Sequence, residues 1–339
     1  MEEIFGKKID PKKFKHFKHE DIMIHIKNRI ADSQKIKEYP QIINDKCLIC
    51  GCVVQTRTYT VNNFIWAHCP DCDHIYKTKM GDYNKLVEFY RNDTVEIYLE
   101  KADIDFRIKN IAAPKIEFVL KNYKAHSTGK WLEIATGLGE VHYILKKMGW
   151  STESTELNKS FVEFAEKNFD VSPQRVTLDE YYEIFKKSGS AQFDVISAFG
   201  YFDMLPDPLS HFKIINRMLK KNGLFGTIVP NGQSLTGALS LHKPDTCLRT
   251  INAVDFSYFS PKSVNICLEK SGFELVSVWW HGLDIHELIV RMIEADPSFA
   301  DSNACSILYD NFNELQAVID KARLSDSYLL CARKIKELE

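Results

Sequence analysis

Two glycines and two acidic residues mark the stretch best suited to binding a small molecule. Residues 131–140 read WLEIATGLGE, in which an apolar run turns at Gly137 and Gly139 before a helical pattern begins. Glycines after a parallel strand let the backbone turn tightly and let a ligand lie against it. The next expected strand ends at Thr155-Glu156-Leu157, nineteen residues after Gly137. A carboxylate at that place can accept hydrogen bonds from both hydroxyls of a ribose.

Three classes of ligand compete for such a turn. A phosphate-binding P-loop needs a Gly-Lys-Ser/Thr after four intervening residues, which the sequence lacks. A dinucleotide fingerprint needs a third small residue, but His142 stands there, and its bulk opposes close packing of helix on strand. NAD is therefore disfavoured but stays an alternative. S-adenosylmethionine fits best, because its nucleoside carries a charged methionine in place of a pyrophosphate.

The segment Glu133-Ile134-Ala135-Thr136-Gly137-Leu138-Gly139 resembles the first motif of the class I S-adenosylmethionine-dependent methyltransferases. That motif is an acidic residue followed by x-G-x-G-x-G, and Ala135 replaces its first glycine here. The resemblance implies that Glu133 orders the loop and the methionine end of the cofactor, and that Glu156 binds the ribose. The cofactor contacts that it implies in full are Glu133, Ala135, Thr136, Gly137, Gly139, Glu156, Leu157 and Ala198.

A second stretch extends this resemblance. Residues 193–231 are similar to the family's fourth-strand region, where F-D-x-I precedes a Leu-Glu-His-Leu-Pro-Asp-Pro stretch. Asp203-Met204 stands in place of the Glu-His pair, so no role of the family's histidine transfers to this chain. The resemblance covers residues 130–280 well and 325–334 more loosely, and it implies a final antiparallel strand.

Two cysteine pairs precede this region. CLIC and CPDC supply Cys47, Cys50, Cys69 and Cys72, with eighteen residues between the pairs. This spacing is typical of a structural zinc site with four thiolates, which leaves no open coordination position for chemistry. Three neighbours could replace one of these ligands: Cys52, His68 and His74. The cysteines at 247, 267, 305 and 331 are scattered and are expected to be buried apolar residues.

A zinc module before a methyltransferase domain resembles two known arrangements. One is the sugar C-methyltransferase group, which acts on nucleotide-linked deoxysugars, and the other is a set of ribosomal-RNA methyltransferases. The pattern CLICG…HCPDCDHIYKTK is more similar to the first. The characteristic C-terminal domain of the sugar group is not evident, so O- or C-methylation of a sugar or related metabolite stays open. An RNA methyltransferase and a non-catalytic zinc-ribbon scaffold are the alternatives.

The methyl acceptor and its base are less well defined. FGYFDMLP lacks the Asn/Asp-Pro-Pro-Tyr/Phe typical of amide or adenine N-methylation, and no cysteine for cytosine chemistry follows a proline there. A base must come from the carboxyl ends of the strands. Four candidates follow the fourth and sixth expected strands: Tyr201, Asp203, His281 and His286.

The alternation of apolar strands and amphipathic helices after Lys130 predicts an α/β fold. We expect a Rossmann-like, doubly wound methyltransferase sheet. The expected division is a helical N-terminal segment at 1–46, a zinc-ribbon-like module at 47–80, a helical connector at 81–125 and the methyltransferase domain at 126–339. A helical insertion is expected at 282–324.

Composition and charge limit the size of the core, the location and the partners that can be expected. The chain has 339 residues, 45% of them hydrophobic, which is enough for a large core. The formal net charge of −2 gives no global electrostatic case for a nucleic acid or an anionic membrane, although residues 6–19 are basic. The sequence has no signal peptide or membrane span, so a cytoplasmic location is expected. The expected partner is a small-molecule or sugar acceptor, and the oligomeric state is open.

Overall fold

The computed structural model describes most of the chain. The described residues are 1–10, 31, 34–36, 38–39, 41–53, 57–61, 64–92, 103–125, 127–242 and 254–338. Among them, no helix combines the length and the apolar character that crossing a bilayer would require.

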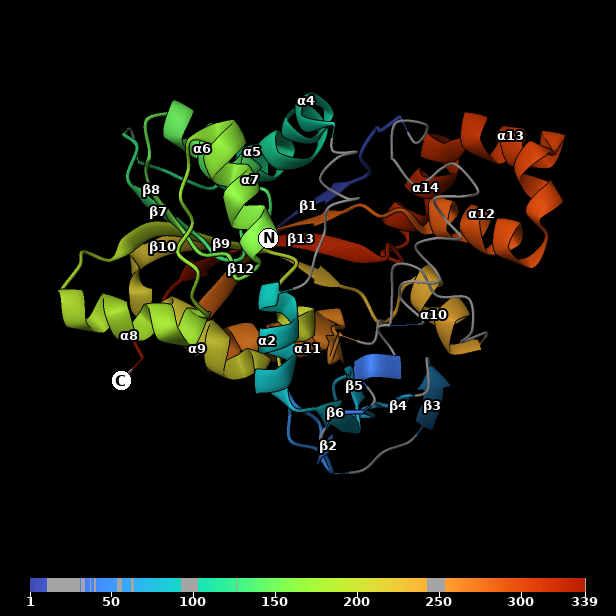
Figure 1. Cartoon of the computed structure of the whole chain (residues 1–339), viewed down its shortest axis with the longest axis horizontal. Coiled ribbons are helices and arrows are strands. Elements are labelled where there is room, and N and C mark those ends of the chain that lie inside the picture. Colours follow the sequence, from blue (N-terminus) through green and yellow to red (C-terminus); the bar gives the residue numbers. More distant parts are fainter. Residues whose placement is uncertain are drawn as a thin grey trace.

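A seven-stranded sheet forms the centre of the molecule (Figure 1). Its strand order is β1-β12-β13-β10-β9-β7-β8. Neighbours are parallel except around β13, which runs antiparallel to both β10 and β12, as expected for the last strand. The strands are β1 (Glu2–Phe5), β7 (Lys130–Glu133), β8 (Ser151–Ser154), β9 (Phe193–Phe199), β10 (Leu219–Pro230), β12 (Phe273–Trp280) and β13 (Ser327–Lys334).

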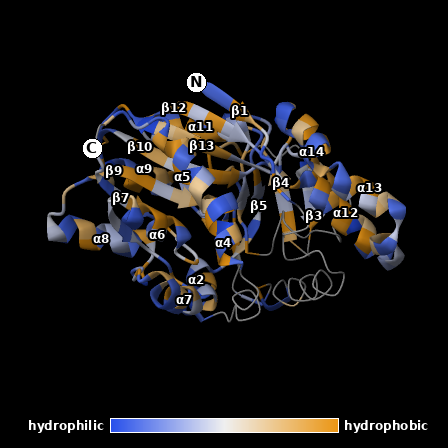
Figure 2. Cartoon of the chain, turned by 90° about the horizontal axis from the view of Figure 1, so that it is seen from above, coloured by the Kyte–Doolittle hydropathy of each residue, from blue (hydrophilic) through white to orange (hydrophobic). Residues whose placement is uncertain are grey.

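Helices cover both faces of this sheet, because successive side chains of each strand point to opposite faces. Trp131, Val195 and Leu224 pack with α5 (Ala113–Leu120) and α6 (Glu140–Lys147) on one face. The residue after each of these, at 132, 196 and 225, packs on the other face with α8 (Leu178–Ser188), α9 (Pro208–Met218) and α11 (Pro261–Lys270). The helices carry both hydrophobic and hydrophilic residues, as amphipathic cover requires (Figure 2).

The helix starts follow their capping residues. Asn158 caps α7 (Lys159–Phe169), Asp207 caps α9 and Ser260 caps α11, each by accepting a backbone N–H of the first turn. Pro208 and Pro261 occupy first-turn positions, where no N–H is needed. Helix α9 ends at Met218, because the chain enters the sheet beside β9 at Leu219.

The N-terminal segment is not the helix that the sequence predicts. Residues 2–5 form β1, which lies parallel to β12 at the edge of the main sheet. β2 (Gln41–Ile43) pairs with β6 (Lys79–Gly81). The helical expectation is wrong at both places, because backbone pairing with distant strands overrides local pattern. Residues 11–30, where the rest of that expectation falls, lie outside the described residues.

The cysteine-containing segment is not a separate unit either. β3 (Arg57–Val61), β4 (Phe64–His68) and β5 (Ile75–Lys77) form an antiparallel sheet. Its fourth strand, β11 (Ser257–Tyr258), comes from the region expected to be the methyltransferase domain. This sheet therefore takes strands from both sides of residue 80, where the sequence predicts the end of the module.

Helices connect and extend these two sheets. α2 (Tyr83–Asn92), α4 (Ile104–Arg107), a π-helical stretch (Ile108–Ala112) and α5 lie between the cysteine segment and β7. After β12 come α12 (Asp284–Ala295), α13 (Asn303–Asp310) and α14 (Phe312–Lys321), at one end of the main sheet (Figure 1). Asp284 at the start of α12 connects the segments at this end of the sheet. Its carboxylate accepts hydrogen bonds from Thr236, Gln316 and the Asp326 backbone.

We expect Gly139→Ala to lower the free energy of unfolding more than Gly149→Ala does. The two glycines have similar φ angles of 88° and 84°. A Cβ at Gly139 would lie 2.9 Å from the Ala165 Cβ, whereas none of the described atoms lies within 4 Å of a Cβ at Gly149. The left-handed backbone should cost about 1–2 kcal/mol at both positions, and the crowding at Gly139 about 1–3 kcal/mol more.

Urea unfolding of the two variants measures this difference, with the midpoint as the readout. Equal decreases in the free energy of unfolding would contradict this prediction, because they would show that α6 and α7 can move apart at this contact at little cost.

Candidate active site and metal centre

The glycine turn lies where the order of the sheet reverses. β7 has β9 on one side and β8 on the other, so the carboxyl ends of these strands flank a crevice. The turn is held by Ile134 N–H, which donates to Ser197 O at 2.7 Å, and by Thr136 N–H, which donates to Thr155 O at 2.9 Å. Ala135, Gly137 and Gly139 all have positive φ angles, of 53°, 60° and 88°. The chain thereby turns sharply into α6.

The Glu156 carboxylate is buried behind this turn. Its Oε2 accepts the Gly137 N–H at 2.8 Å, and its Oε1 accepts the Asn158 N–H at 2.9 Å. Burial raises the pKa of Glu156 to about 7, against the opposing effect of these backbone donors. Each oxygen keeps a second lone pair for a further donor. The side chain can therefore accept two ligand hydroxyls without giving up its bonds to the protein.

A cavity of about 250 Å³ lies between the turn and helix α2. The segments at the carboxyl edge of the sheet form one wall, with residues 134, 135, 137, 155–157, 176–178, 199–201, 204 and 205. Tyr83, Phe89 and Tyr90 of α2 and Phe256 line the opposite side. The walls are mainly apolar and aromatic, which suits a ring system such as adenine.

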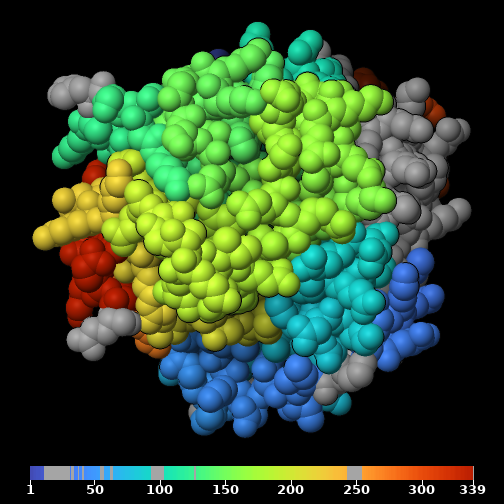
Figure 3. Space-filling model, turned by 60° about the vertical axis from the view of Figure 1, so that its left-hand side comes forward, coloured from blue at the N-terminus to red at the C-terminus, as the bar shows by residue number. Residues whose placement is uncertain are grey.

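Helix α2 is fastened over this cavity. Arg91 forms a 2.9 Å ion pair with Glu180, and Asn158 Nδ2 donates to Tyr90 O at 3.0 Å. Arg91 and Arg175 also donate to each other's carbonyl oxygens, at 3.2 Å. The surface of α2, cyan in Figure 3, lies directly against the yellow-green surface of the segments that follow β8. The helix expected only as a connector thus covers the site.

The structure brings four of the expected cofactor contacts to the cavity wall: Ala135, Gly137, Glu156 and Leu157. The other four lie outside it. Gly139 faces Ala165 of α7, and Thr136 is buried in the turn. The Ala198 side chain packs into the core, because strand alternation turns it away from the crevice, and its assignment as a cofactor contact stays a prediction.

Glu133 is buried in β7 and also lies outside the cavity wall. Its carboxylate accepts the Ser197 hydroxyl, and burial raises its pKa to about 8. Lys115 of α5 is the nearest counter-charge, and burial lowers the pKa of that amine to about 8. The position of Glu133 behind the loop fits a role in ordering the turn rather than in lining the cavity.

The four candidate bases divide into two pairs. Tyr201 lines the cavity, and Asp203 is two residues further on, in a 3₁₀ turn whose neighbours Met204 and Leu205 also line it. Burial raises the pKa of Asp203 to about 7.

His281 and His286 lie elsewhere, after β12 and in α12. The His281 ring instead contacts the Trp279 ring, with centroids 4.5 Å apart. β10 and β13 lie between β12 and β9 in the sheet order, and neither histidine lines the cavity, so their assignment as bases stays a prediction.

Several wall residues escape sequence reasoning. Tyr83, Phe89 and Tyr90 come from a helix more than forty residues before the glycine turn, and Phe256 comes from beside the cysteine sheet. No local pattern points to them. The capping box of Thr177 and Glu180 is a signal that the sequence does contain. It marks the start of α8, and this helix start places residues 176–178 at the same edge of the sheet as the glycine turn.

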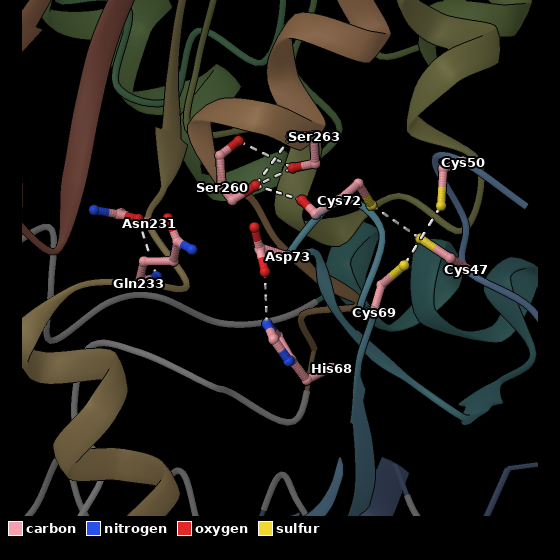
Figure 4. Close-up of polar contacts among 10 residues, drawn as sticks. All are labelled: Cys47, Cys50, His68, Cys69, Cys72, Asp73, Asn231, Gln233, Ser260 and Ser263. Atoms are coloured by element: carbon pink, nitrogen blue, oxygen red, sulfur yellow. Dashed lines mark hydrogen bonds and ion pairs between the residues drawn. The ribbon is translucent and has the colours of Figure 1, made fainter. Parts of the chain in front are cut away.

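The four paired cysteines meet at one point (Figure 4). The sulfur atoms of Cys47 and Cys72 are 3.5 Å apart, those of Cys50 and Cys69 are 3.4 Å apart, and all four lie within 4.8 Å of one another. Four thiolates at the usual zinc–sulfur bond length form a tetrahedron with edges of about 3.8 Å. The observed arrangement fits such a centre.

The two cysteine pairs adopt the same backbone turn. Cys47 N–H donates to Cys52 O and Gly51 N–H to Cys47 O, while Cys69 N–H donates to His74 O and Asp73 N–H to Cys69 O. Gly51 and Asp73 both have positive φ, of 81° and 56°. Each pair therefore aims its two sulfur atoms to the same side of a tight knuckle.

The alternate ligands point away from this centre. His68 pairs with Asp73 at 3.4 Å, and the His74 Nε2 lies 3.2 Å from the Ser257 hydroxyl. Cys52 contributes its carbonyl to the first knuckle and is not part of the sulfur cluster. The two C-x2-C pairs are thus the residues that could hold a metal ion.

Helix α11 holds the cysteine centre against the main core. The Ser260 hydroxyl donates to Cys72 O at 2.6 Å, at the N-terminus of α11, and Lys270 donates to Ile49 O at 3.1 Å near its C-terminus (Figure 4 shows the first contact). Cys47, Cys69 and Cys72 pack in the same apolar cluster as Val264 and Cys267. From this centre, β5 leads to β11, and the Phe256 N–H donates to Asp203 O at 2.6 Å.

Comparison with known proteins identifies the family. Residues 106–278, just over half of the chain, match the family model described as a methyltransferase domain. No curated protein matches the chain.

Many solved structures share the fold. A S-adenosylmethionine-dependent methyltransferase from Archaeoglobus fulgidus is 18% identical, with a TM-score of 0.46, over 70% of this chain and 100% of that one. A complex between the Haloferax volcanii Trm112 methyltransferase activator and a methyltransferase matches at 12% identity and a TM-score of 0.48, over 74% and 98%. A methyltransferase from Mesorhizobium loti matches at 13% and 0.43, over 67% and 99%.

The assignment depends on the family model together with the geometry above, because these structural similarities are too low to carry it. The sheet has the methyltransferase order, with its antiparallel last strand, and the glycine turn and a buried acid meet at its switch point. The chain belongs to the methyltransferase-domain family, and it is an S-adenosylmethionine-dependent methyltransferase.

Proposed function

We propose that this methyltransferase acts on a hydroxyl, or a carbon, of a sugar, nucleotide-sugar or related small metabolite. The observation that carries the proposal is the covered cavity of about 250 Å³, with the Tyr201 side chain in its wall and Asp203 close by. Because α2 is fastened across it by Arg91, the described walls favour a small acceptor over a folded macromolecule. The formal charge of −2 supports the same choice.

The residues present fit S-adenosylmethionine, whose sulfonium supplies the methyl group. Glu156 would accept the two ribose hydroxyls through its free lone pairs. Gly137 lets the ligand approach the backbone, because nothing among the described residues lies within 4 Å of the place of a Cβ there. Tyr90 and Leu178 offer apolar surfaces for the adenine.

The acceptor end of the cavity needs a group that can take a proton. Asp203 has a pKa raised by burial to about 7, the range in which a carboxylate is an efficient general base near neutral pH. Asp255 is the other carboxylate that raises it. One oxygen of Asp203 has no hydrogen-bond partner among the described residues. Tyr201, two residues before Asp203 in the sequence, lines the cavity.

We also propose that the cysteine centre binds a structural zinc ion. Four cysteine sulfurs in a closed set suit zinc and leave it no open position. Its part in the reaction would be to position residues 254–260, because this segment pairs with β5 and supplies Phe256 to the cavity.

Replacing Glu156 with alanine should weaken S-adenosylmethionine binding. Loss of the paired hydroxyl contacts should cost about 1.5–3 kcal/mol, or about 10- to 150-fold in Kd. Isothermal titration calorimetry gives the value. Glu163→Ala, an exposed carboxylate on α7, is the matched control and should bind as the wild type does.

The same contact predicts a pH dependence. The folded protein's Glu156 has its pKa raised to about 7, so below that pH it is mostly protonated and must lose a proton to accept both hydroxyls. Affinity should therefore rise from pH 6 to 8 and then level off, and this rise should be reduced in Glu156→Gln. A wild-type affinity that is flat across this range would contradict the ribose assignment.

The metal proposal predicts about one zinc per chain by elemental analysis of purified protein. Cys69→Ser should lose the metal and melt at a lower temperature, because a closed thiolate site contributes directly to folding. Cys305→Ser, a buried cysteine in α13, should keep it. A metal-free wild type purified without chelators would refute the zinc centre.

The acceptor class can be tested with methyl-labelled S-adenosylmethionine. A panel of nucleoside-diphosphate sugars and free sugars should contain at least one compound that becomes labelled, at a rate that depends little on salt. Labelled RNA, with binding that falls steeply as salt rises, would favour the RNA methyltransferase alternative. Calorimetry that detects no S-adenosylmethionine binding at millimolar concentration would favour the non-catalytic scaffold.

A further inference from the structure

Three polar side chains form a chain from the cavity wall to the surface. The Tyr201 hydroxyl lies 2.7 Å from Nδ1 of His211, and Nε2 of His211 lies 3.3 Å from Oδ2 of Asp179. Tyr201 is in the cavity wall and His211 is 5% exposed, whereas the Asp179 side chain is 58% exposed. The three groups therefore connect a covered site with solvent.

The fold brings these residues together from three elements. Tyr201 follows β9, His211 is in the first turns of α9, and Asp179 is at the second position of α8. The N-terminal turns of α8 and α9 lie side by side beneath the sheet (Figure 1). A carboxylate in the first turn of a helix is stabilised by the helix dipole, which suits Asp179 to stay ionised. The hydrogen bond from His211 also holds the pKa of Asp179 below its usual range.

The partners define which nitrogen of His211 carries the proton. A tyrosine hydroxyl donates to Nδ1 in this arrangement, so the neutral imidazole has its proton on Nε2, directed at Asp179. Burial raises the pKa of Tyr201 well above its usual value, which excludes a standing phenolate. Tyr201 can therefore accept a proton only while it passes its own to His211.

Methylation of a hydroxyl releases a proton inside a covered cavity. We propose that Tyr201, His211 and Asp179 form a relay that carries this proton from the acceptor to solvent. This inference rests on the proposed function, since it requires a hydroxyl acceptor.

The step balances as follows. The acceptor oxygen forms a bond to the methyl carbon as the carbon–sulfur bond breaks, and the electron pair of that bond stays on sulfur. The acceptor proton moves to the Tyr201 oxygen while the Tyr201 proton moves to Nδ1 of His211. The resulting imidazolium is stabilised by Asp179 and releases its Nε2 proton to water through the exposed carboxylate. Tyr201 contacts the acceptor, and His211 and Asp179 act through it.

Other charged groups surround this relay. Tyr83 of α2 faces Tyr201, and Glu180 of α8 lies near Tyr83. On the outer side, Lys213 and Arg217 of α9 line the same groove as Asp179. Asp179 is the only one of these that hydrogen-bonds the His211 ring on its outer side within the described chain.

Single-turnover methyl transfer tests the relay, with S-adenosylmethionine pre-bound and the acceptor found in the sugar panel. His211→Gln should lower the rate about 100-fold or more, with unchanged affinity for S-adenosylmethionine. The wild-type rate should be lower in D2O than in H2O, because the relay moves protons as the methyl group is transferred. This solvent isotope effect should be reduced in His211→Gln. A merely structural histidine would lower the rate and leave the isotope effect unchanged.

Two more variants complete the test. Asp179→Asn should lose several-fold in rate, since the imidazolium loses its stabilising charge. Asp170→Asn changes an exposed carboxylate at the C-terminus of α7, and this control variant should have the wild-type rate. A His211→Gln rate within threefold of wild type would overturn the relay and leave Asp203 as the base.

Nitrogen-15 NMR separates failure of the relay from failure of the proposed acceptor. If no compound in the panel is methylated, the acceptor proposal fails, but the relay still predicts that His211 carries its proton on Nε2. Tyr201→Phe should then shift the Nδ1 resonance. A His211 with its proton on Nδ1, or one unaffected by Tyr201→Phe, would refute the relay.

Discussion

The hydrogen bond between the Gly137 N–H and the Glu156 carboxylate is the contact around which the site is arranged. It joins the turn after β7 to the residue that follows β8, at the point where the sheet order reverses. Gly137 directs its N–H to this carboxylate at a φ of 60°, which glycine adopts without strain, and Glu156 tolerates burial because two backbone N–H groups satisfy it. Loss of this contact would open the crevice in which the cofactor must lie.

The cysteine centre and the cavity are connected through one short segment. Residues 254–260 supply Phe256 to the cavity, β11 to the cysteine sheet and Ser260 to the Cys72 carbonyl. The proposed zinc ion would thereby help to fix one wall of the cavity. This arrangement favours a positional role for the centre over a role as a separate binding arm. It also explains why the four cysteines pack within the main apolar core.

The covered character of the site has a chemical consequence. A lid such as α2 excludes water and strengthens the interactions inside, but it also removes the solvent that would otherwise take up a released proton. Groups whose pKa is shifted by burial, such as Asp203 and Tyr201, gather at this wall. Catalytic sites commonly collect such groups. In the proposed mechanism, side chains of α2 exclude solvent from the cavity, and other side chains of the same cavity carry the proton out.

The sequence by itself determined the local features: the strand–glycine turn–helix unit, Glu156, the capped helices and the two C-x2-C pairs. Each depends on contacts within a few residues or on a spacing that ligand geometry imposes. Tertiary structure alone decided the placement of α2 over the cavity, the pairing of β1 and β11, and the meeting of Tyr201 with His211 and Asp179. It also separated His281 and His286 from the site, because strand order is not set by order along the chain. Such contacts arise from long-range packing, which no local pattern encodes.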